Sequence, residues 1–192
     1  MTAGAPGSWL ARLDELGIRL PQVAAPVAAY VPAVQTGSLV FTSGQLPFVD
    51  GGLRHTGKVG GSVDPDVATH EAGVCALNAL AAIDALVGLD SVRRVVRVVG
   101  YVASSEGFTG QPQVVNGASE LLGRIFGEAG RHARSAVGVA ELPLGAPVEV
   151  ELTVEICPSR VRPRPCSCCV TASPASRSTC CAARRACRSP AG

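Results

Sequence analysis

Residues 148–156 alternate apolar and polar side chains without exception. The sequence Val-Glu-Val-Glu-Leu-Thr-Val-Glu-Ile puts every apolar side chain on one face of an extended strand and every polar one on the other. Because successive side chains of a strand point to opposite faces, this pattern predicts a half-buried antiparallel strand. The chain therefore has to build a sheet with an apolar layer against one face.

Two longer segments have the spacing of helices. Asp64 and Pro65 fit a helix start, because aspartate accepts from free N–H groups and proline needs no N–H partner in the first turn. This helix is expected to run to about Val87 and to end at Gly88. Its apolar residues cover much of its circumference and predict burial against a sheet; they are Val74, Leu77, Leu80, Ala81, Ile83 and Val87. A second amphipathic helix, closed by Gly130, is predicted from Val114, Ala118, Leu121, Leu122 and Ile125.

Shorter segments complete the sheet. Residues 30–34 and 39–43 flank a turn as the strands of a hairpin, and the glycine-rich residues 50–61 fit a loop. Residues 91–104 form a valine-rich strand that is apolar on both faces, as in a central strand. On it, Val95, Val99 and Tyr101 are expected on one face, and Val96, Val98 and Val102 on the other. A further strand is expected over 134–140.

The N-terminal part adds a short helix. Ser8 is expected to cap a helix that begins at Trp9, and Gly17 to end it. Leu10, Leu13 and Leu16 would form the stripe that packs on the domain.

The predicted order is hairpin, helix, strand, helix, strand, strand. This order gives an α+β fold, with two helices packed on one face of a mixed β-sheet. The other face carries Glu149 and Glu151 beside small apolar residues. Copies of the same chain would cover such a face, so a homo-oligomer is expected.

Composition indicates one domain, over residues 1–157. The 192 residues are 47% apolar and 17% charged, enough for one ordinary core. Seven of the 17 Lys and Arg residues lie in 158–192, which leaves ten against 15 Asp and Glu, so residues 1–157 carry a charge of about −5. An acidic body argues against nucleic-acid binding. We find no secretory signal and no run of ~18 uninterrupted apolar residues, and expect a cytoplasmic protein without membrane contact.

Residues 158–192 differ from the rest in composition. They are rich in Arg, Pro, Ser and Cys and hold almost no large apolar residue, so we expect a disordered tail. We expect neither a metal site nor a disulfide framework among its cysteines. The abrupt change suggests a frameshift or readthrough product, a hypothesis that an intact mass of all 192 residues in the natively expressed protein would contradict.

Arg134 is the residue that points most directly to a ligand. It enters an apolar strand pattern, and its planar guanidinium matches a carboxylate in a bidentate way that lysine cannot. A small carboxylate is the natural ligand. The alternative is that Arg134 only flanks the strand and faces solvent.

Three segments carry a resemblance to a known family. They are residues 30–34, residues 39–47, and residues 134–137 leading through Leu142-Pro143 to residues 148–151. In this order and spacing they resemble the Rid family of reactive-intermediate deaminases, also called the YjgF or endoribonuclease L-PSP family. The resemblance covers about residues 25–157, and the N-terminal extension resembles that of a longer subgroup.

The resemblance implies a fold and a reaction. It implies a chorismate-mutase-like subunit in a homotrimer, with ligand clefts between subunits. Members with the cleft arginine hydrolyse 2-imino acids and their enamine tautomers to 2-oxo acids and ammonia, as 2-iminobutanoate/2-iminopropanoate deaminases do. This hydrolysis requires no metal or organic cofactor.

The resemblance also implies roles for single residues. Arg134 falls on the position that binds the carboxylate, and Glu149 on the acidic residue near the attacking water. Tyr30 and Ser43 line the cleft, and Gly44 lets backbone approach the ligand. Ala136 stands at a cleft position where cysteine is frequent.

Each role has a simpler alternative. Glu149 is one of several polar residues on its strand face; Tyr30 could cover the core, and Ser43 could satisfy backbone at a strand end. His55, His70 and His132 show no metal spacing and, with Cys75, no nucleophile pair, so we expect them to be structural or surface residues.

Two other functions compete with the deaminase. The same cleft could bind a 2-oxo acid without turnover, as a sensor does. A ribonuclease would need a pair of histidines suited to acid and base catalysis, and the acidic body would repel phosphate chains.

Overall fold

A computed structural model describes residues 8–23 and 29–157 of this chain. The predicted tail, residues 158–192, lies outside the described residues. The main sheet has five strands in the order β1-β2-β7-β5-β6. They are β1 Ala33–Thr36, β2 Leu39–Thr42, β7 Val148–Ile156, β5 Val92–Ala103 and β6 Ala133–Val139. Only β5 and β6 run parallel; the other neighbours are antiparallel.

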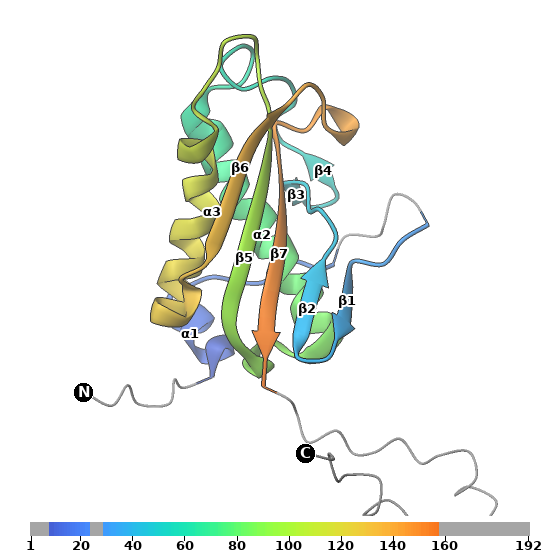
Figure 1. The fold of residues 1–192 in the computed structure, drawn as a ribbon, viewed down its shortest axis with the longest axis vertical. Coiled ribbons are helices and arrows are strands. Elements are labelled where there is room, and N and C mark those ends of the chain that lie inside the picture. The colour runs from blue at the N-terminus through green and yellow to red at the C-terminus, as the bar shows by residue number, and fades with distance from the viewer. Residues whose placement is uncertain (1–7, 24–28, 158–192) are drawn as a thin grey trace, which may run out of the picture. The chain divides into compact units, whose positions relative to one another are not determined.

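The helices form a layer on one face of this sheet. Helix α2 (Pro65–Val87) and helix α3 (Gln111–Phe126) lie on the same side of it, and the short helix α1 (Trp9–Glu15) lies near the end of α3 (Figure 1). Three 3₁₀ turns follow α2, α3 and β6: Leu89–Ser91, Gly127–Gly130 and Pro143–Gly145. The predicted α+β fold, with two helices on one face of a mixed sheet, is confirmed.

The longest elements end where the sequence predicts. The Asp64 carboxylate accepts from the backbone N–H of Asp66 at 2.8 Å, and Gly88 follows the last residue of α2 with a positive φ of 79°. The apolar residues of β7 are buried, while its polar residues are half-buried on the opposite face. A single apolar core therefore lies between β7, β5 and the helix layer.

One prediction for α2 is wrong. Val74 and Leu77 are only partly buried, and the buried side is formed mainly by small residues. Alanines allow α2 to approach the sheet and α3 closely. Leu80 and Ile83 are fully buried among them, whereas Val74 and Leu77 lie at the margin of the buried side. Helix α2, with its 23 residues, also has the length and the apolar composition of a membrane span. However, 56% of its most apolar 18-residue stretch is buried inside the protein. We regard it as a core helix.

Strand β5 departs from simple alternation. Its pairing with β7 shifts register between Val92 and Arg94 and again between Val95 and Arg97. As a result Val95 and Val98 are both buried. The prediction that Val95 shares a face with Val99 and Tyr101 is wrong, because an extra residue at a register shift turns the side chains that precede it.

Two smaller predictions also need correction. In α1 the buried residues are Trp9 and Leu13, whereas Leu10 is exposed. The Trp9 Nε1–H donates to the Val92 carbonyl at 2.8 Å, which turns the helix away from the expected leucine stripe. The segment 50–61 is not all loop, because β4 (Gly52–Leu53) pairs with β3 (Phe48–Val49).

Candidate functional site

Glu149 lies against the backbone of Gly44. The two residues meet where the chain leaves β2 and crosses beside β7, next to the paired backbones of Gln45 and Val150. A Cβ atom added to Gly44 would lie 1.6 Å from Oε1 of Glu149. With any other residue at position 44, the Glu149 carboxylate would have to move from this place. The Glu149 side chain faces away from the helix layer, because its neighbours Val148 and Val150 are buried in the core.

The surroundings of Glu149 favour a protonated carboxyl. Partial burial, followed by the negative charge of Glu151, raises the pKa of Glu149. Tyr101 lies directly across from Glu149 on β5. Partial burial and the charges of Glu151 and Glu149 raise the pKa of Tyr101 as well. A carboxyl group with a raised pKa can take up and return a proton, which is the property required of a general acid and base.

Ser43 and Tyr30 lie beside this cluster. The Ser43 hydroxyl donates to the carbonyl of Val31 at 2.6 Å, and its N–H donates to the carbonyl of Pro32. These bonds tie the segment that carries Tyr30 to the end of β2. Tyr30 itself is 44% exposed and precedes β1. The prediction that residues 30–34 form one strand holds only from Ala33 onward.

Arg134 lies on the other face of the sheet. It pairs in register with Val98 on β5, and Val98 in turn pairs with Leu152 on β7. Both of these neighbours are buried toward the helices. The exposed Arg134 side chain reaches α3, where its Nη1 donates to Asn116 Oδ1 at 2.8 Å and to Ser119 Oγ at 3.1 Å. Ala136 faces the same side and packs at the margin of the core.

One copy of the chain does not bring all six predicted site residues together. Ser43, Gly44 and Glu149 meet near β7, whereas Arg134 and Ala136 belong to the edge strand β6, on the opposite face. The sequence did not predict which polar groups surround the Glu149 set near β7 and the Arg134 set on β6. Glu151 was named only as another polar residue on the face of Glu149, and His132 was expected to be a structural or surface residue.

The sequence does contain signals for these neighbours. Glu151 and Glu149 are two residues apart on a strand, so they share a face. His132 and Arg134 have the same spacing, and Asn116 and Ser119 are three residues apart on a helix, so each pair shares a face too. None of these signals says that α3 packs beside β6.

Helix α2 carries two buried titratable groups, Cys75 and Glu71, which are not among the predicted site residues. Burial, then the charges of Glu71 and Glu149, raise the pKa of Cys75 well above its ordinary value, so its thiol stays protonated. Glu71 is fully buried, with Oε1 2.9 Å from Nδ1 of His55. Within residues 8–23 and 29–157, no group of three or more His, Cys, Asp or Glu side chains is placed to hold a metal ion.

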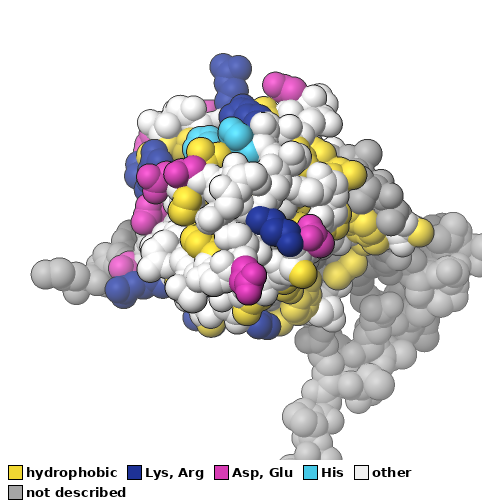
Figure 2. Space-filling view, turned by 90° about the horizontal axis from the view of Figure 1, so that it is seen from above, with side chains coloured by type: hydrophobic (Ala, Val, Ile, Leu, Met, Phe, Trp, Pro, Cys, Tyr) yellow, Lys and Arg dark blue, Asp and Glu magenta, His cyan; other side chains and the backbone are white. Residues whose placement is uncertain are grey.

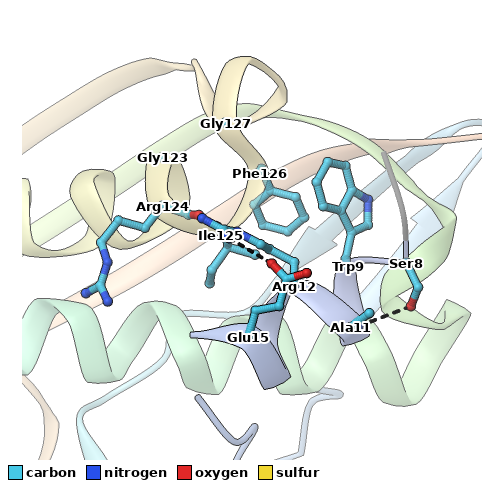
Figure 3. A pocket seen from close by; sticks show the side chains of 10 residues that line it. All are labelled: Ser8, Trp9, Ala11, Arg12, Glu15, Gly123, Arg124, Ile125, Phe126 and Gly127. Carbon is cyan, nitrogen blue, oxygen red and sulfur yellow. Dashed lines mark hydrogen bonds and ion pairs between the residues drawn. The ribbon is translucent and has the colours of Figure 1, made fainter. Parts of the chain in front are cut away.

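A separate pocket of about 440 Å³ lies between α1 and the end of α3 (Figure 3). The rings of Trp9 and Phe126 meet edge to face there at 4.9 Å. Arg12 pairs with Glu15 at 2.9 Å and donates from Nε to the Arg124 carbonyl at 3.3 Å. The pocket contains none of the predicted site residues. Its contacts fasten the N-terminal helix to the domain.

The surface at one end of the molecule carries both signs of charge. Figure 2 shows Lys and Arg side chains interspersed with Asp and Glu, rather than a continuous basic patch. Such a face lacks the electrostatic footprint of nucleic-acid binding.

Known proteins match almost the whole described chain. The model of a family described as "YjgF/chorismate_mutase-like, putative endoribonuclease" matches residues 10–156. Protein TCP17 of Trypanosoma cruzi is 47% identical over 158 residues, which cover 81% of this chain and 99% of that protein.

Two solved structures are also similar to this chain. A protein of unknown function from Agrobacterium tumefaciens is 46% identical, with a TM-score of 0.72, over 78% of this chain and 92% of its own. An endoribonuclease-like protein from Shewanella oneidensis is 32% identical, with a TM-score of 0.75, over 78% of this chain and 100% of its own.

Proposed function

The chain belongs to the YjgF/chorismate mutase-like family, and on this premise we propose that it is a deaminase. Its substrates would be reactive 2-imino acids and their enamine tautomers, and its products a 2-oxo acid and ammonia. The proposal includes a homotrimer that works in the cytoplasm. It assigns carboxylate binding to Arg134 and proton transfer to Glu149, with Tyr30, Ser43, Gly44 and Ala136 lining the cleft.

The hydrogen bonds of Arg134 are the observation that most directly supports this proposal. Its guanidinium is held by two neutral oxygen atoms, those of Asn116 and Ser119. Within the described part of the chain it forms no ion pair, whereas Arg12, Arg93, Arg94 and Arg131 each pair with a glutamate. Arg134 is thus fixed in place with its charge unneutralised. Both of these hydrogen bonds use Nη1, so the Nε–Nη2 edge is available for a bidentate carboxylate.

Glu149 fits the chemical step. A water molecule attacks the carbon of the protonated imine, Glu149 accepts one of the water protons, and a carbinolamine forms. Return of that proton to the nitrogen makes ammonia the leaving group. As the C–N bond breaks, the remaining hydroxyl proton passes to the Glu149 carboxylate and the oxygen becomes the carbonyl of the 2-oxo acid. A carboxyl group with a raised pKa suits both proton transfers. Fixing the substrate carboxylate on Arg134 supplies the orientation.

The two residues need different copies of the chain. Within one chain Arg134 and Glu149 face opposite sides of the sheet, and β5 lies between their strands. An open sheet face with Glu149 can meet the β6 edge of a neighbour in a closed ring. In the proposed trimer each cleft takes Arg134 from one subunit and Glu149 from the next.

Mixed trimers test this arrangement. Chains with Arg134→Ala and chains with Glu149→Gln are co-expressed with different tags, and trimers that contain both are isolated. Each homotrimer is expected to be inactive. A mixed trimer contains one cleft with both native residues, so about one third of the wild-type rate per trimer should return. Imine generated by an amino-acid oxidase is followed as it decays. No recovery in mixed trimers would refute a shared cleft.

A binding module is the alternative function. Its cleft would capture a 2-oxo acid without turnover, and it would also need Arg134. The Glu149→Gln variant separates the two functions. Lost turnover with retained affinity for 2-oxobutanoate supports the deaminase, whereas a wild-type protein that binds 2-oxobutanoate and hydrolyses none of several imines supports the binding module.

A further inference from the structure

Arg134 is the first member of a chain of hydrogen bonds. Its Nη1 donates to Ser119 Oγ at 3.1 Å, and Ser119 Oγ lies 3.0 Å from Nε2 of His132. The other ring nitrogen of His132, Nδ1, lies 2.6 Å from the carbonyl oxygen of Gly130. Four groups from β6, α3 and the turn before β6 are therefore linked in series.

When the His132 ring is neutral, its bonding partners set the direction of every bond. A carbonyl oxygen only accepts, so Nδ1 of His132 carries the proton that is donated to Gly130. In the neutral ring Nε2 is then the acceptor, and the Ser119 hydroxyl donates to it. With its proton committed to His132, the Ser119 oxygen offers a lone pair to Arg134. Hydrogen bonds aligned in this way polarise and strengthen one another.

The local fold brings these groups together. His132 and Arg134 are separated by one residue in extended chain, so they project to the same side. Asn116 and Ser119 are one turn apart on α3 and face β6 together. Between them lies Gly117, where an added Cβ would come within 1.8 Å of the carbonyl oxygen of Thr69 on α2. This close contact holds α3 against α2. It therefore also sets where Asn116 and Ser119 lie relative to Arg134.

We propose that Ser119 and His132 are positioning residues for Arg134, an inference that rests on the deaminase function proposed above. They hold the guanidinium in its binding orientation without supplying a negative charge that would compete with the substrate carboxylate. Neither residue touches the reacting imine carbon. Their loss should weaken capture of the carboxylate and leave the chemical step at Glu149 largely intact.

The test uses variants that cut the chain at different points. Ser119→Ala removes one of the two acceptors of Arg134 and leaves Asn116 in place. His132→Phe keeps a ring but removes the acceptor of Ser119. His132→Gln retains a side-chain oxygen that can accept from Ser119. Ser91→Ala is the control, because the Ser91 hydroxyl also donates one hydrogen bond within the fold, to the carbonyl of Gly88 at 2.7 Å, and Ser91 lies before β5, seven residues from Val98, the strand partner of Arg134.

Steady-state kinetics and ligand binding give the first readout. We expect Ser119→Ala and His132→Phe to raise both the KM for the imine and the Kd for 2-oxobutanoate roughly tenfold, as the loss of one hydrogen bond to a charged group does. Their kcat should stay within about twofold of the wild type, because proton transfer is untouched. His132→Gln should recover most of the affinity, and Ser91→Ala should match the wild type. Unchanged KM and Kd in both cut variants would overturn the inference.

Side-chain NMR of Arg134 gives a second readout that does not depend on activity. In the wild type, rotation of the guanidinium about its Nε–Cζ bond should be slow, and it should become fast in Ser119→Ala. If the wild type neither binds 2-oxobutanoate nor hydrolyses imines, the proposed function fails, yet faster rotation in the variant would still support the positioning role. Rotation that is equally fast in both proteins would overturn it.

Discussion

At the scale of residues, the candidate site depends on two charged groups, Arg134 and Glu149, that form no ion pair within the described part of the chain. Arg134 rests on the oxygens of Asn116 and Ser119, and Glu149 lies against the backbone of Gly44. A substrate carboxylate can supply the counter-charge for Arg134, and a proton can neutralise Glu149. Small changes in these surroundings should therefore change binding or proton transfer more than they change folding.

Gly44 offers a direct test of the Glu149 environment. The added methyl of Gly44→Ala would lie 1.6 Å from Oε1 of Glu149, so the carboxylate has to move. We expect kcat for imine hydrolysis to fall roughly a hundredfold, the size typical for a displaced general base, with little change in the thermal midpoint. Gly52→Ala is the control, because its added Cβ would contact nothing within 4 Å. Equal activity of the two variants would contradict the role of Glu149.

The pH dependence of activity should report the Glu149–Glu151 pair. Burial and the charge of Glu151 raise the pKa of Glu149, so the acid limb of the kcat/KM profile should lie above the ordinary glutamate value of 4.5. Glu151→Gln removes the negative neighbour, lowers the pKa of Glu149 and moves this limb to lower pH. Glu155→Gln is the control, because Glu155 lies further along β7 and pairs with Arg93 and Arg94. A limb that stays in place in Glu151→Gln would show that another group titrates there.

At the scale of elements, the contact between α2 and α3 supports the Arg134 half of the site. The two helices approach closely at Gly117, which faces the Thr69 carbonyl. On the far side of the same turn, Asn116 and Ser119 hold Arg134. Packing between the helices is therefore coupled to the position of the guanidinium.

Two glycines of α3 make this coupling measurable. Gly117→Ala should lower the free energy of unfolding by about 1–3 kcal/mol, because backbone atoms of α2 have to move, and it should also raise the KM. Gly123→Ala meets nothing within 4 Å and should raise the free energy of unfolding by up to about 1 kcal/mol through its helix propensity. Chemical denaturation measures both. A stable Gly117→Ala variant would disprove the close helix contact.

At the scale of the whole molecule, no element within residues 8–23 and 29–157 covers the sheet face opposite the helices. Val34, Phe41 and Val137 are large apolar residues exposed on it, and Tyr101 and Glu149 lie among them. This combination of apolar contact surface and candidate site is expected of a face buried between subunits.

Charge on this face should break the assembly and the activity together. Phe41 is 38% exposed and pairs with Val34 on the neighbouring strand. In sedimentation, Phe41→Asp should change the proposed trimer to a monomer, and imine hydrolysis should be lost, because each cleft needs two chains. Leu86→Asp is the control, since Leu86 is similarly exposed on α2 in the helix layer. A fully active Phe41→Asp monomer would refute the shared cleft.

The sequence by itself determined the type and limits of the main elements. The alternation of residues 148–156 and the capping residues at Asp64 and Gly88 act through neighbours in the chain, so β7 and α2 have the predicted bounds. It also singled out Arg134, because a guanidinium in an apolar strand pattern requires a partner, whereas Glu149 was assigned only through the family resemblance.

Only the tertiary structure decided which side chains meet. The register shift in β5 places Val95 on the buried face. The packing of α3 beside β6 brings Asn116 and Ser119 to Arg134, and Ser119 to His132. The same strand pairing puts Arg134 and Glu149 on opposite faces of the sheet. The physical reason is that local patterns act over a few residues, whereas contacts between distant segments depend on strand register and on how closely the elements pack. Single glycines permit the closest of these contacts, Gly117 between α3 and α2 and Gly44 beside Glu149.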